Sequence, residues 1–123
     1  MVIGLIIADD LTGAMDTGHQ FAARGYRTTL NTHLADQGPD TEVRIIDTDS
    51  RTTSPETAYK TVFSVMQDTS AEIIYKKIDS TLRGNVATEA AAVLDNQNPE
   101  FAVVAPAFPA HNRRTIGGYH LVD

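Results

Sequence analysis

Cysteine is absent from this sequence of 123 residues, and so are long apolar runs and basic stretches. Without cysteine, the chain forms no disulfide bond and offers no thiolate to a metal ion. None of its apolar runs approaches the ~20 residues that a helix needs to span a bilayer. No basic residue precedes the first apolar run, which leads directly into Asp9 and Asp10, unlike a secretory signal peptide. These absences favour a cytoplasmic protein that does not bind membranes.

Positive charge is also scarce, since 10 lysine and arginine residues stand against 16 aspartate and glutamate residues, for a formal net charge of -6. An acidic chain without a basic tract does not attract nucleic acid by bulk electrostatics, so we expect no nucleic-acid partner. The glycine-rich patterns that bind dinucleotides or nucleotide phosphates are missing. No histidine pair has the spacing of metal ligands, and we expect no metal site. The histidines are His19, His33, His111 and His120.

The composition, with 41% hydrophobic and 21% charged residues, is that of one globular domain. Apolar runs alternate with segments of helical periodicity. Strands are predicted over residues 2–8, 26–31, 43–48, 72–78 and 101–105, and helices over 12–24, from Ser54 onward and over 86–94. Residues 33–42 and 106–118 are predicted to be connections, and 119–122 the start of another strand. This order predicts an α/β fold, a three-layer Rossmann-like open parallel sheet of about five strands with helices on both faces.

Two of the predicted helices have identifiable ends and faces. Leu11 and Met15, four residues apart, have the spacing expected for the apolar face of the first helix. Gly25 is expected to end that helix. The second helix begins with Ser54 as its N-cap and Pro55 in its first turn. Its apolar face consists of Ala58, Val62, Val65 and Met66.

Polar residues gather where the predicted strands end. Right-handed crossovers place the carboxyl ends of parallel strands at one edge of a sheet, where ligands bind in open α/β folds. The polar segments at or after these ends are residues 9–10, 47–51, 77–84 and 112–115. We therefore expect a ligand site at this edge.

Asp9 and Asp10 directly follow the first strand. One of the two carboxylates is expected to cap the following helix. The other has no structural role in strand packing and needs a cation, a basic side chain or a substrate hydroxyl beside it. A carboxylate in that position orients a hydroxyl group or accepts its proton.

Arg51 follows the third strand and offers a planar fork suited to a carboxylate or a phosphate. The segment Asp47–Arg51 also fits a plain turn with a solvated arginine, and by itself it would not indicate a site.

The densest polar segment runs from Lys76 to Asn85. Strand alternation sends Lys76 and Lys77 to opposite faces of the sheet. Ser80 and Thr81 are typical N-cap residues, and Gly84 permits a close backbone approach. These residues predict a cradle for an anion that also carries hydroxyl groups. The alternative is a helix start stabilised by an Asp79–Arg83 pair.

The last predicted connection supplies further cations. Asn112, Gly117 and Gly118 tolerate a positive φ angle, while Arg113 and Arg114 add two guanidinium groups.

Four segments of the chain, in this order, resemble the four-carbon acid sugar kinase family, which includes D-threonate, D-erythronate and 3-oxo-tetronate kinases. The segments are residues 7–18, 47–51, 76–85 and 105–109. The family pattern usually has Gly-Arg-x-Thr after the last segment, whereas this chain has Asn112-Arg113-Arg114-Thr115. Asparagine adopts the left-handed conformation for which glycine is used, so the role of Arg113 is expected to be kept.

The resemblance implies that residues 1–123 are part of an N-terminal acid-sugar-binding domain, with the C-terminal nucleotide-binding domain absent from this chain. The full-length enzyme would use ATP with Mg²⁺, while this chain alone would bind neither. Implied partners are a small acid sugar, the missing domain or another chain, and a second copy of the protein. The expected substrate-binding residues are Asp9, Asp10, Arg51, Lys77, Asp79, Ser80, Thr81, Arg83, Gly84 and Arg113, with Asp10 or Asp79 as candidate base. Arg51 and the segment Ser80–Thr81 are expected to hold the substrate carboxylate.

Two other functions remain open from the sequence. One is a stand-alone acid-sugar-binding module, or an inactive truncated gene product, without kinase activity. The other is a response-regulator-like domain that would be phosphorylated on Asp10 or Asp47.

Overall fold

A computed structural model describes residues 1–32 and 40–123. Four strands form one parallel sheet in the order β2-β3-β1-β4. The strands are β1 (Val2–Ala8), β2 (Thr28–Asn31), β3 (Val43–Asp47) and β4 (Ala71–Lys77). The helices are α1 (Leu11–Ala22), α2 (Pro55–Gln67) and α3 (Val86–Gln97). The predicted connection over 33–42 lies largely outside the described residues.

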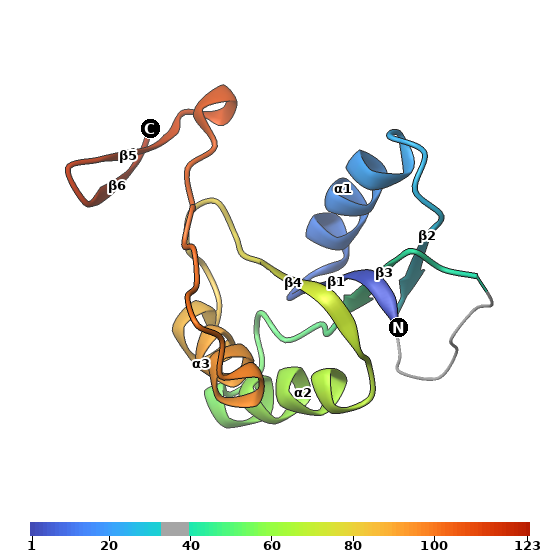
Figure 1. The fold of residues 1–123 in the computed structure, drawn as a ribbon. Coiled ribbons are helices and arrows are strands. Elements are labelled where there is room, and N and C mark those ends of the chain that lie inside the picture. The colour runs from blue at the N-terminus through green and yellow to red at the C-terminus, as the bar shows by residue number, and fades with distance from the viewer. Residues whose placement is uncertain (33–39) are drawn as a thin grey trace.

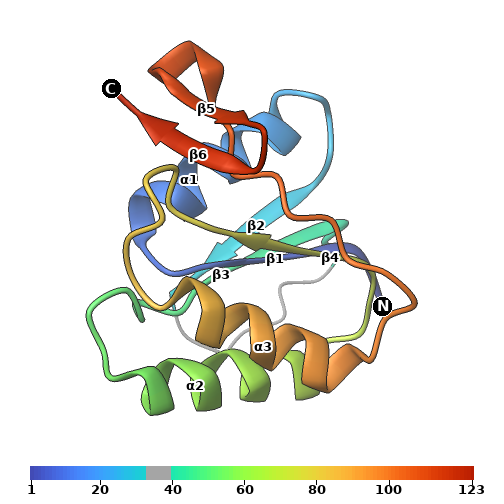
Figure 2. The same ribbon diagram turned by 90° about the vertical axis from the view of Figure 1, so that its left-hand side faces the viewer.

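The sheet separates two apolar clusters. Helix α1 covers one face, and α2 and α3 lie side by side on the other (Figures 1 and 2). Central strand β1 contributes to both clusters, because Leu5 and Ile7 face α2 and α3 while Ile6 and Ala8 face α1. All four side chains are buried. The predicted α/β class with helices on both faces of a parallel sheet is confirmed.

Helix α1 approaches the sheet closely because its buried face is made of small residues. Gly13, Ala14, Thr17 and Gly18 are buried, and a Cβ atom at Gly18 would lie 2.6 Å from Ile45 Cδ1. Leu11 and Met15, which the helical spacing assigned to the apolar face, are instead exposed. Larger side chains could not occupy the buried face at this helix–sheet distance. Gly25 lies two residues after the C-cap Ala23 with φ +90°.

Helix α2 begins as its sequence predicts. Ser54 is the N-cap, and its Oγ accepts a hydrogen bond from Thr57 N at 3.2 Å. Pro55 occupies the first turn, and the predicted face Ala58, Val62, Val65 and Met66 is buried.

The predicted strand over 101–105 is wrong. These residues form no strand and join no sheet, and Phe101, Val103 and Val104 are 77%, 80% and 77% exposed. A β-strand needs hydrogen bonds from a neighbouring strand, which an apolar sequence alone does not supply. The main sheet of the described residues therefore has four strands, and β4 is one of its edges.

The predicted connection over 106–118 contains more regular structure than expected. A short 3₁₀ helix, η1 (Pro109–His111), precedes strands β5 (Arg113–Ile116) and β6 (Tyr119–Val122), which pair antiparallel. Gly117 and Gly118, with φ +57° and +84°, make the two-residue turn between them. The expected strand at 119–122 is confirmed. The hairpin lies on the α1 side of the sheet (Figures 1 and 2).

Among the described residues, none of the helices combines the length and apolar character needed to cross a membrane.

Candidate functional site

The carboxyl ends of β3, β1 and β4 lie next to one another at one edge of the sheet. Ala8, the last residue of β1, pairs with Asp47 on one side and with Lys77 on the other. The connections that follow these strands therefore start within a few ångströms of one another, as the sequence predicts.

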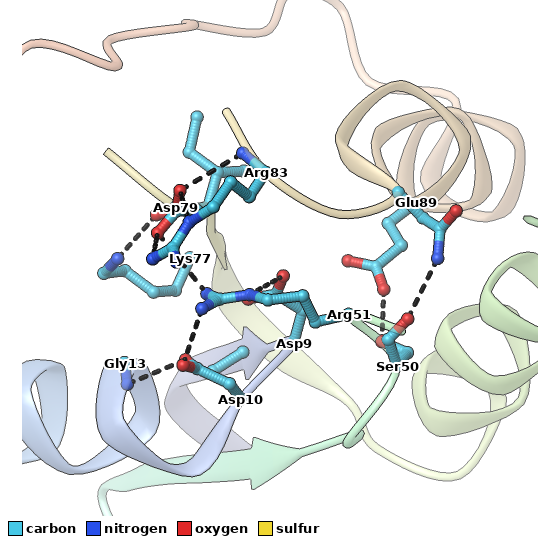
Figure 3. A network of polar contacts seen from close by, with 12 residues as sticks. Asp9, Asp10, Gly13, Ser50, Arg51, Lys77, Asp79, Arg83 and Glu89 are labelled. Carbon is cyan, nitrogen blue, oxygen red and sulfur yellow. Dashed lines mark hydrogen bonds and ion pairs between the residues drawn. The ribbon is translucent and has the colours of Figure 1, made fainter. Parts of the chain in front are cut away.

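Arg51 joins the side chains of this edge. Its Nε and Nη2 donate to Asp9 Oδ2 and Oδ1 at 3.0 and 3.1 Å. Its Nη1 lies 2.9 Å from Asp10 Oδ2, and its Nη2 lies 3.7 Å from Asp79 Oδ1. Figure 3 shows the guanidinium group between these carboxylates. We call Asp9, Asp10, Arg51 and Asp79 the Arg51 cluster. The hydrogen bond between Arg51 and Asp9 raises the pKa of Arg51.

The two consecutive aspartates divide their roles as expected. Asp10 is the N-cap of α1, since its Oδ1 accepts a hydrogen bond from Gly13 N at 2.9 Å. Asp9, only 2% exposed, has a basic side chain beside it, one of the partners that the sequence predicts, because Arg51 binds both of its oxygens. The buried position makes a partner of this kind necessary.

Asp79 is the most heavily bonded carboxylate of the edge. It accepts hydrogen bonds from the backbone and hydroxyl of Thr81 at 3.2 and 2.5 Å. The Nε and Nη2 atoms of Arg83 each donate to it at 2.9 Å. These contacts, those of Arg83 first, hold the pKa of Asp79 far below its ordinary value. The Asp79–Arg83 pair is therefore present, and Asp79 is a weak proton acceptor in this state.

The segment Ser80–Thr81 does not start a helix, contrary to the N-cap interpretation. Helix α3 begins at Val86, after Asn85. Thr81 binds Asp79 instead, while Ser80 O lies 2.6 Å from His120 Nε2 of the β5–β6 hairpin. Nothing in the sequence position of His120 indicates this contact.

Gly84 packs directly against the Arg51 cluster. Its φ is +89°, and a Cβ atom there would lie 3.0 Å from Asp9 Oδ2 and 3.1 Å from Arg51 Cγ. The predicted close backbone approach is confirmed, because a side chain would occupy the space of the ion pair.

Lys76 and Lys77 point to opposite faces of the sheet, as strand alternation predicts. Lys77 lies beside the first turn of α1, where a Cβ atom at Gly13 would be 3.7 Å from its Nζ. Its Nζ donates to Ile78 O at 2.5 Å. Lys76 turns toward α3, and its Nζ lies 2.7 Å from Glu89 Oε2. Only Lys77 is therefore on the side of the Arg51 cluster (Figure 3).

Arg113 is the predicted site residue that the structure does not connect to this edge. It lies on β5, where its Nη1 donates to His111 O. Its buried Nε has no hydrogen-bond partner within the part of the chain that the structure describes. Asn112, just before Arg113, has φ +58°, the left-handed conformation expected where the family pattern has glycine.

Asp47 and Glu89 are the buried carboxylates at this edge that the list of expected site residues omitted. Asp47 is 8% exposed, and its Oδ1 accepts a hydrogen bond from Asp49 N at 2.9 Å. Burial, followed by the nearby acidic side chains, raises its pKa. The position of Asp47 at the end of a predicted strand could have indicated that it belongs to this edge. Glu89 is 1% exposed within α3. Its place as a single glutamate in the alanine-rich part of the helix could have indicated a buried polar role.

The arrangement favours a ligand that carries both hydroxyl groups and negative charge. Carboxylate oxygens that are held by cations accept hydrogen bonds from hydroxyl groups, and the cations prevent net repulsion of an anion. Within residues 1–32 and 40–123, histidine, aspartate and glutamate side chains form no group of three or more that could hold a metal ion.

Comparisons with known proteins show which family the chain belongs to. A family model described as "Sugar-binding N-terminal domain" matches residues 4–123. D-erythronate kinase of Heliobacterium modesticaldum is 44% identical across 96% of this chain, and D-threonate kinase of Cupriavidus necator is 42% identical across 97%. The chain spans 29% of the length of each of these two relatives.

A solved structure from Bordetella bronchiseptica, described as a domain of unknown function with bound citrate in a domain-swapped dimer, has a TM-score of 0.89 to this fold. It is 35% identical, and the match covers 97% of this chain and 32% of that one. The chain therefore belongs to the family of sugar-binding N-terminal domains, which confirms its resemblance to the N-terminal part of D-erythronate, D-threonate and 3-oxo-tetronate kinases.

Proposed function

We propose that this chain is the substrate-binding part of an ATP-dependent kinase that phosphorylates a hydroxyl group of a four-carbon acid sugar of the threonate or erythronate type. The observation that carries the proposal is the Arg51 cluster, in which carboxylates from two connections meet at the ligand-binding edge of an α/β sheet. The names of the curated relatives support the substrate class. Phosphoryl transfer depends mainly on positioning and charge compensation, which are the properties this edge offers.

The substrate hydroxyl groups would lie against the carboxylates. Asp10 and Asp79 are bound by cations on one side, and a carboxylate retains further acceptor positions. These two residues would therefore fix the hydroxyl groups of the sugar. The contacts of Arg83 hold the pKa of Asp79 low, so proton removal by Asp79 would occur late, as charge develops on the attacking oxygen.

The substrate carboxylate would bind to cations other than Arg51. Each of the nitrogen atoms at the end of the Arg51 side chain already faces a carboxylate of the protein. Lys77 lies beside the first turn of α1, and the Arg83 side chain is 67% exposed while its Nε and Nη2 hold Asp79. We assign recognition of the substrate anion to Lys77 and Arg83, and the ordering of the site to Arg51.

The whole enzyme would bind ATP and Mg²⁺ outside this chain. The terminal nitrogen atoms of Arg51 already face carboxylates of the protein, and the glycine-rich patterns that bind nucleotide phosphates are missing from the sequence. We therefore place nucleotide binding in a C-terminal domain outside residues 1–123, as the family resemblance implies. The whole enzyme would act in the cytoplasm.

Isothermal titration calorimetry of the chain with D-threonate, D-erythronate and neutral erythritol tests this proposal. At least one of the acids should bind saturably, and erythritol should bind more weakly because it lacks the anion. Arg83→Met should weaken acid binding by about tenfold, the effect of losing one charge-assisted contact. Arg24→Met, an exposed arginine whose described partner is Gln20, is the matched control and should leave the affinity unchanged. Absence of binding by both acids would contradict the proposal.

A stand-alone acid-sugar-binding module is the second candidate, favoured by the fact that all members of the Arg51 cluster come from residues 1–123. This candidate predicts the same binding data. It differs in a phosphoryl-transfer assay of the product of the complete reading frame, in which ATP and an acid sugar would give no phosphorylated sugar.

We also propose that the protein forms a dimer. The solved neighbour with bound citrate is described as a domain-swapped dimer, and the exposed apolar segment 101–105 offers a surface for such an exchange.

A further inference from the structure

A buried ion pair lies beneath the Arg51 cluster, on the opposite face of the sheet. Glu89 of α3 is 1% exposed, and its Oε2 lies 2.7 Å from Nζ of Lys76, whose side chain is 9% exposed. The other oxygen, Oε1, accepts a hydrogen bond from the Ser50 hydroxyl (Figure 3). Lys76 Nζ also donates to Lys77 O at 2.8 Å. Glu89 thus links α3, β4 and the connection that follows β3.

Stability alone does not account for this pair. Removing two charges from water costs about as much as their attraction returns, so apolar side chains of similar size would serve a core equally well. The surrounding positions of α3 are mostly alanine, which gives Glu89 no other polar partner on its own helix. A buried charge pair does, however, fix the relative positions of the groups that it joins.

The group that Glu89 fixes is Ser50, the residue before Arg51. Backbone N–H groups of Ser50 and Arg51 donate to Asp9 O at 3.0 and 3.2 Å. Asn85, which precedes α3, donates from Nδ2 to Ser50 O at 2.9 Å. Ser50 is therefore held by the end of β1, by the start of α3 and by Glu89. Arg51 emerges from this fixed turn toward Asp9 and Asp10.

We propose that Glu89, paired with Lys76, is a positioning residue of the acid-sugar site. It holds the Ser50 turn in the one place from which Arg51 reaches all the carboxylates of its cluster, and it does not touch the substrate itself. This inference rests on the proposed function for the identity of the ligand, but the geometry of the Arg51 cluster can be measured without a ligand.

Glu89→Gln tests the proposal with almost no change in shape. A carboxylate accepts from Ser50 and from Lys76 at once, whereas an amide has only one oxygen and presents an NH₂ group to the other donor. The amide carries no charge for Lys76, and it keeps the Ser50 contact only by turning its NH₂ group toward the hydroxyl oxygen. The variant therefore removes the ion pair and reverses or breaks the hydrogen bond with Ser50. Val65→Ala is the control, because Val65 belongs to the buried apolar cluster on the α2–α3 side of the sheet and is not itself part of the Ser50 turn or of the ion pair.

Two measurements separate positioning from stability. The first is the affinity for D-erythronate and D-threonate, by calorimetry well below the unfolding temperature. The second is the NMR signal of the Arg51 Nε–H group in the ligand-free protein, which reports its bond to Asp9. We expect Glu89→Gln to weaken acid binding at least tenfold and to shift or broaden the Arg51 signal. Val65→Ala should lower the unfolding temperature yet leave both measurements as in the wild type.

The proposal is overturned if Glu89→Gln only lowers the unfolding temperature while affinity and the Arg51 signal stay unchanged. If Glu89→Gln does not fold, Ser50→Ala removes the same contact without altering any charge and should change both measurements in the same direction; unchanged values there overturn the proposal equally. If the wild type binds neither acid, the proposed function fails, and the Arg51 signal alone decides whether Glu89 positions the cluster.

Discussion

Asp47 is a buried carboxylate at the end of β3 for which the structure describes no ion-pair partner. Its pKa is raised above 3.8, first by burial and then by the charges of nearby acids. The folded state therefore binds a proton at Asp47 more tightly than the unfolded state does. This contribution to stability is fully present below pH 3.8 and is lost as the pH rises through the folded-state pKa.

Asp47→Asn should stabilise the protein at pH 7, because the amide keeps the hydrogen bond from Asp49 N without a buried charge. The gain over the wild type should shrink toward zero below pH 3.8, where Asp47 is protonated in both states. Thermal unfolding of both proteins between pH 3 and pH 8 measures this dependence. A gain of equal size at every pH would show that charge is not the cause.

Gly84→Ala should disturb the Asp9–Arg51 ion pair, because the added methyl group would contact it. The added Cβ would lie 3.0 Å from Asp9 Oδ2 at a φ of +89°, so both strain and crowding oppose it. We expect a loss of about 1–3 kcal/mol in the free energy of unfolding, together with weaker acid-sugar binding. Gly25→Ala is a matched control, because φ is +90° there and no atom lies within 4 Å of the added Cβ. Equal losses of stability in the two variants, with unchanged binding, would contradict this account.

At the scale of elements, the first turns of the helices show which local signals are reliable. Asp10 and Ser54 both cap helices as their residue types predict, because a cap depends only on a few neighbouring residues. Asn85 has the right residue type and position, yet its side chain binds Ser50 O and Thr53 O instead of its own helix. Tertiary contacts decided that case, and no local pattern contains them.

Ser54→Ala should destabilise the protein by about 1 kcal/mol, the usual cost of losing an N-cap. The hydroxyl of Ser54 accepts from Thr57 N, which would be left without this partner. Chemical denaturation measures the change. Ser64→Ala, in the middle of α2, provides the comparison and should leave stability nearly unchanged or slightly higher, because alanine favours helix. A loss of the same size at both positions would mean that the cap contributes nothing.

The strands differ in the same way. β1 and β3 could be predicted because each is a nearly continuous apolar run, the composition of parallel strands buried on both faces. β4 could be predicted from its β-branched and aromatic residues Ile73, Ile74 and Tyr75. Residues 101–105 have the apolar composition of a strand but pair with no other strand. Strand β5 at 113–116 was not predicted, because its two arginines and its threonine interrupt any apolar pattern.

The meeting of Asp9, Asp10, Arg51 and Asp79 could be predicted, because it depends on strand ends alone. The position of Arg113 depends on the β5–β6 hairpin, which the sequence pattern did not indicate.

For the whole molecule, the main consequence of the fold is that apolar side chains of β4 and of residues 101–105 are exposed. Ile73 and Tyr75 of β4 are 63% and 48% exposed, and Phe101, Val103 and Val104 are more exposed still. Exposed apolar side chains in this number promote association even in a chain with a net charge of -6.

Residues 1–123 should therefore self-associate at micromolar concentration, and the double variant Val103→Ser/Val104→Ser should shift the population toward monomer. Sedimentation velocity gives the size distribution. Leu94→Ser, which changes an exposed leucine on α3, controls for a general effect of polarity. A wild type that stays monomeric at all concentrations would rule out association through this surface.

The most direct test of the account is an amide NMR titration of the chain with D-erythronate and D-threonate. We predict that the shifted signals belong to the connections at the carboxyl ends of β1, β3 and β4, with Gly13, Arg51 and Gly84 among them. Shifts confined to the opposite edge of the sheet, around Arg27 and Thr69, or no shifts at millimolar acid, would contradict the claim that the Arg51 cluster forms the acid-sugar site.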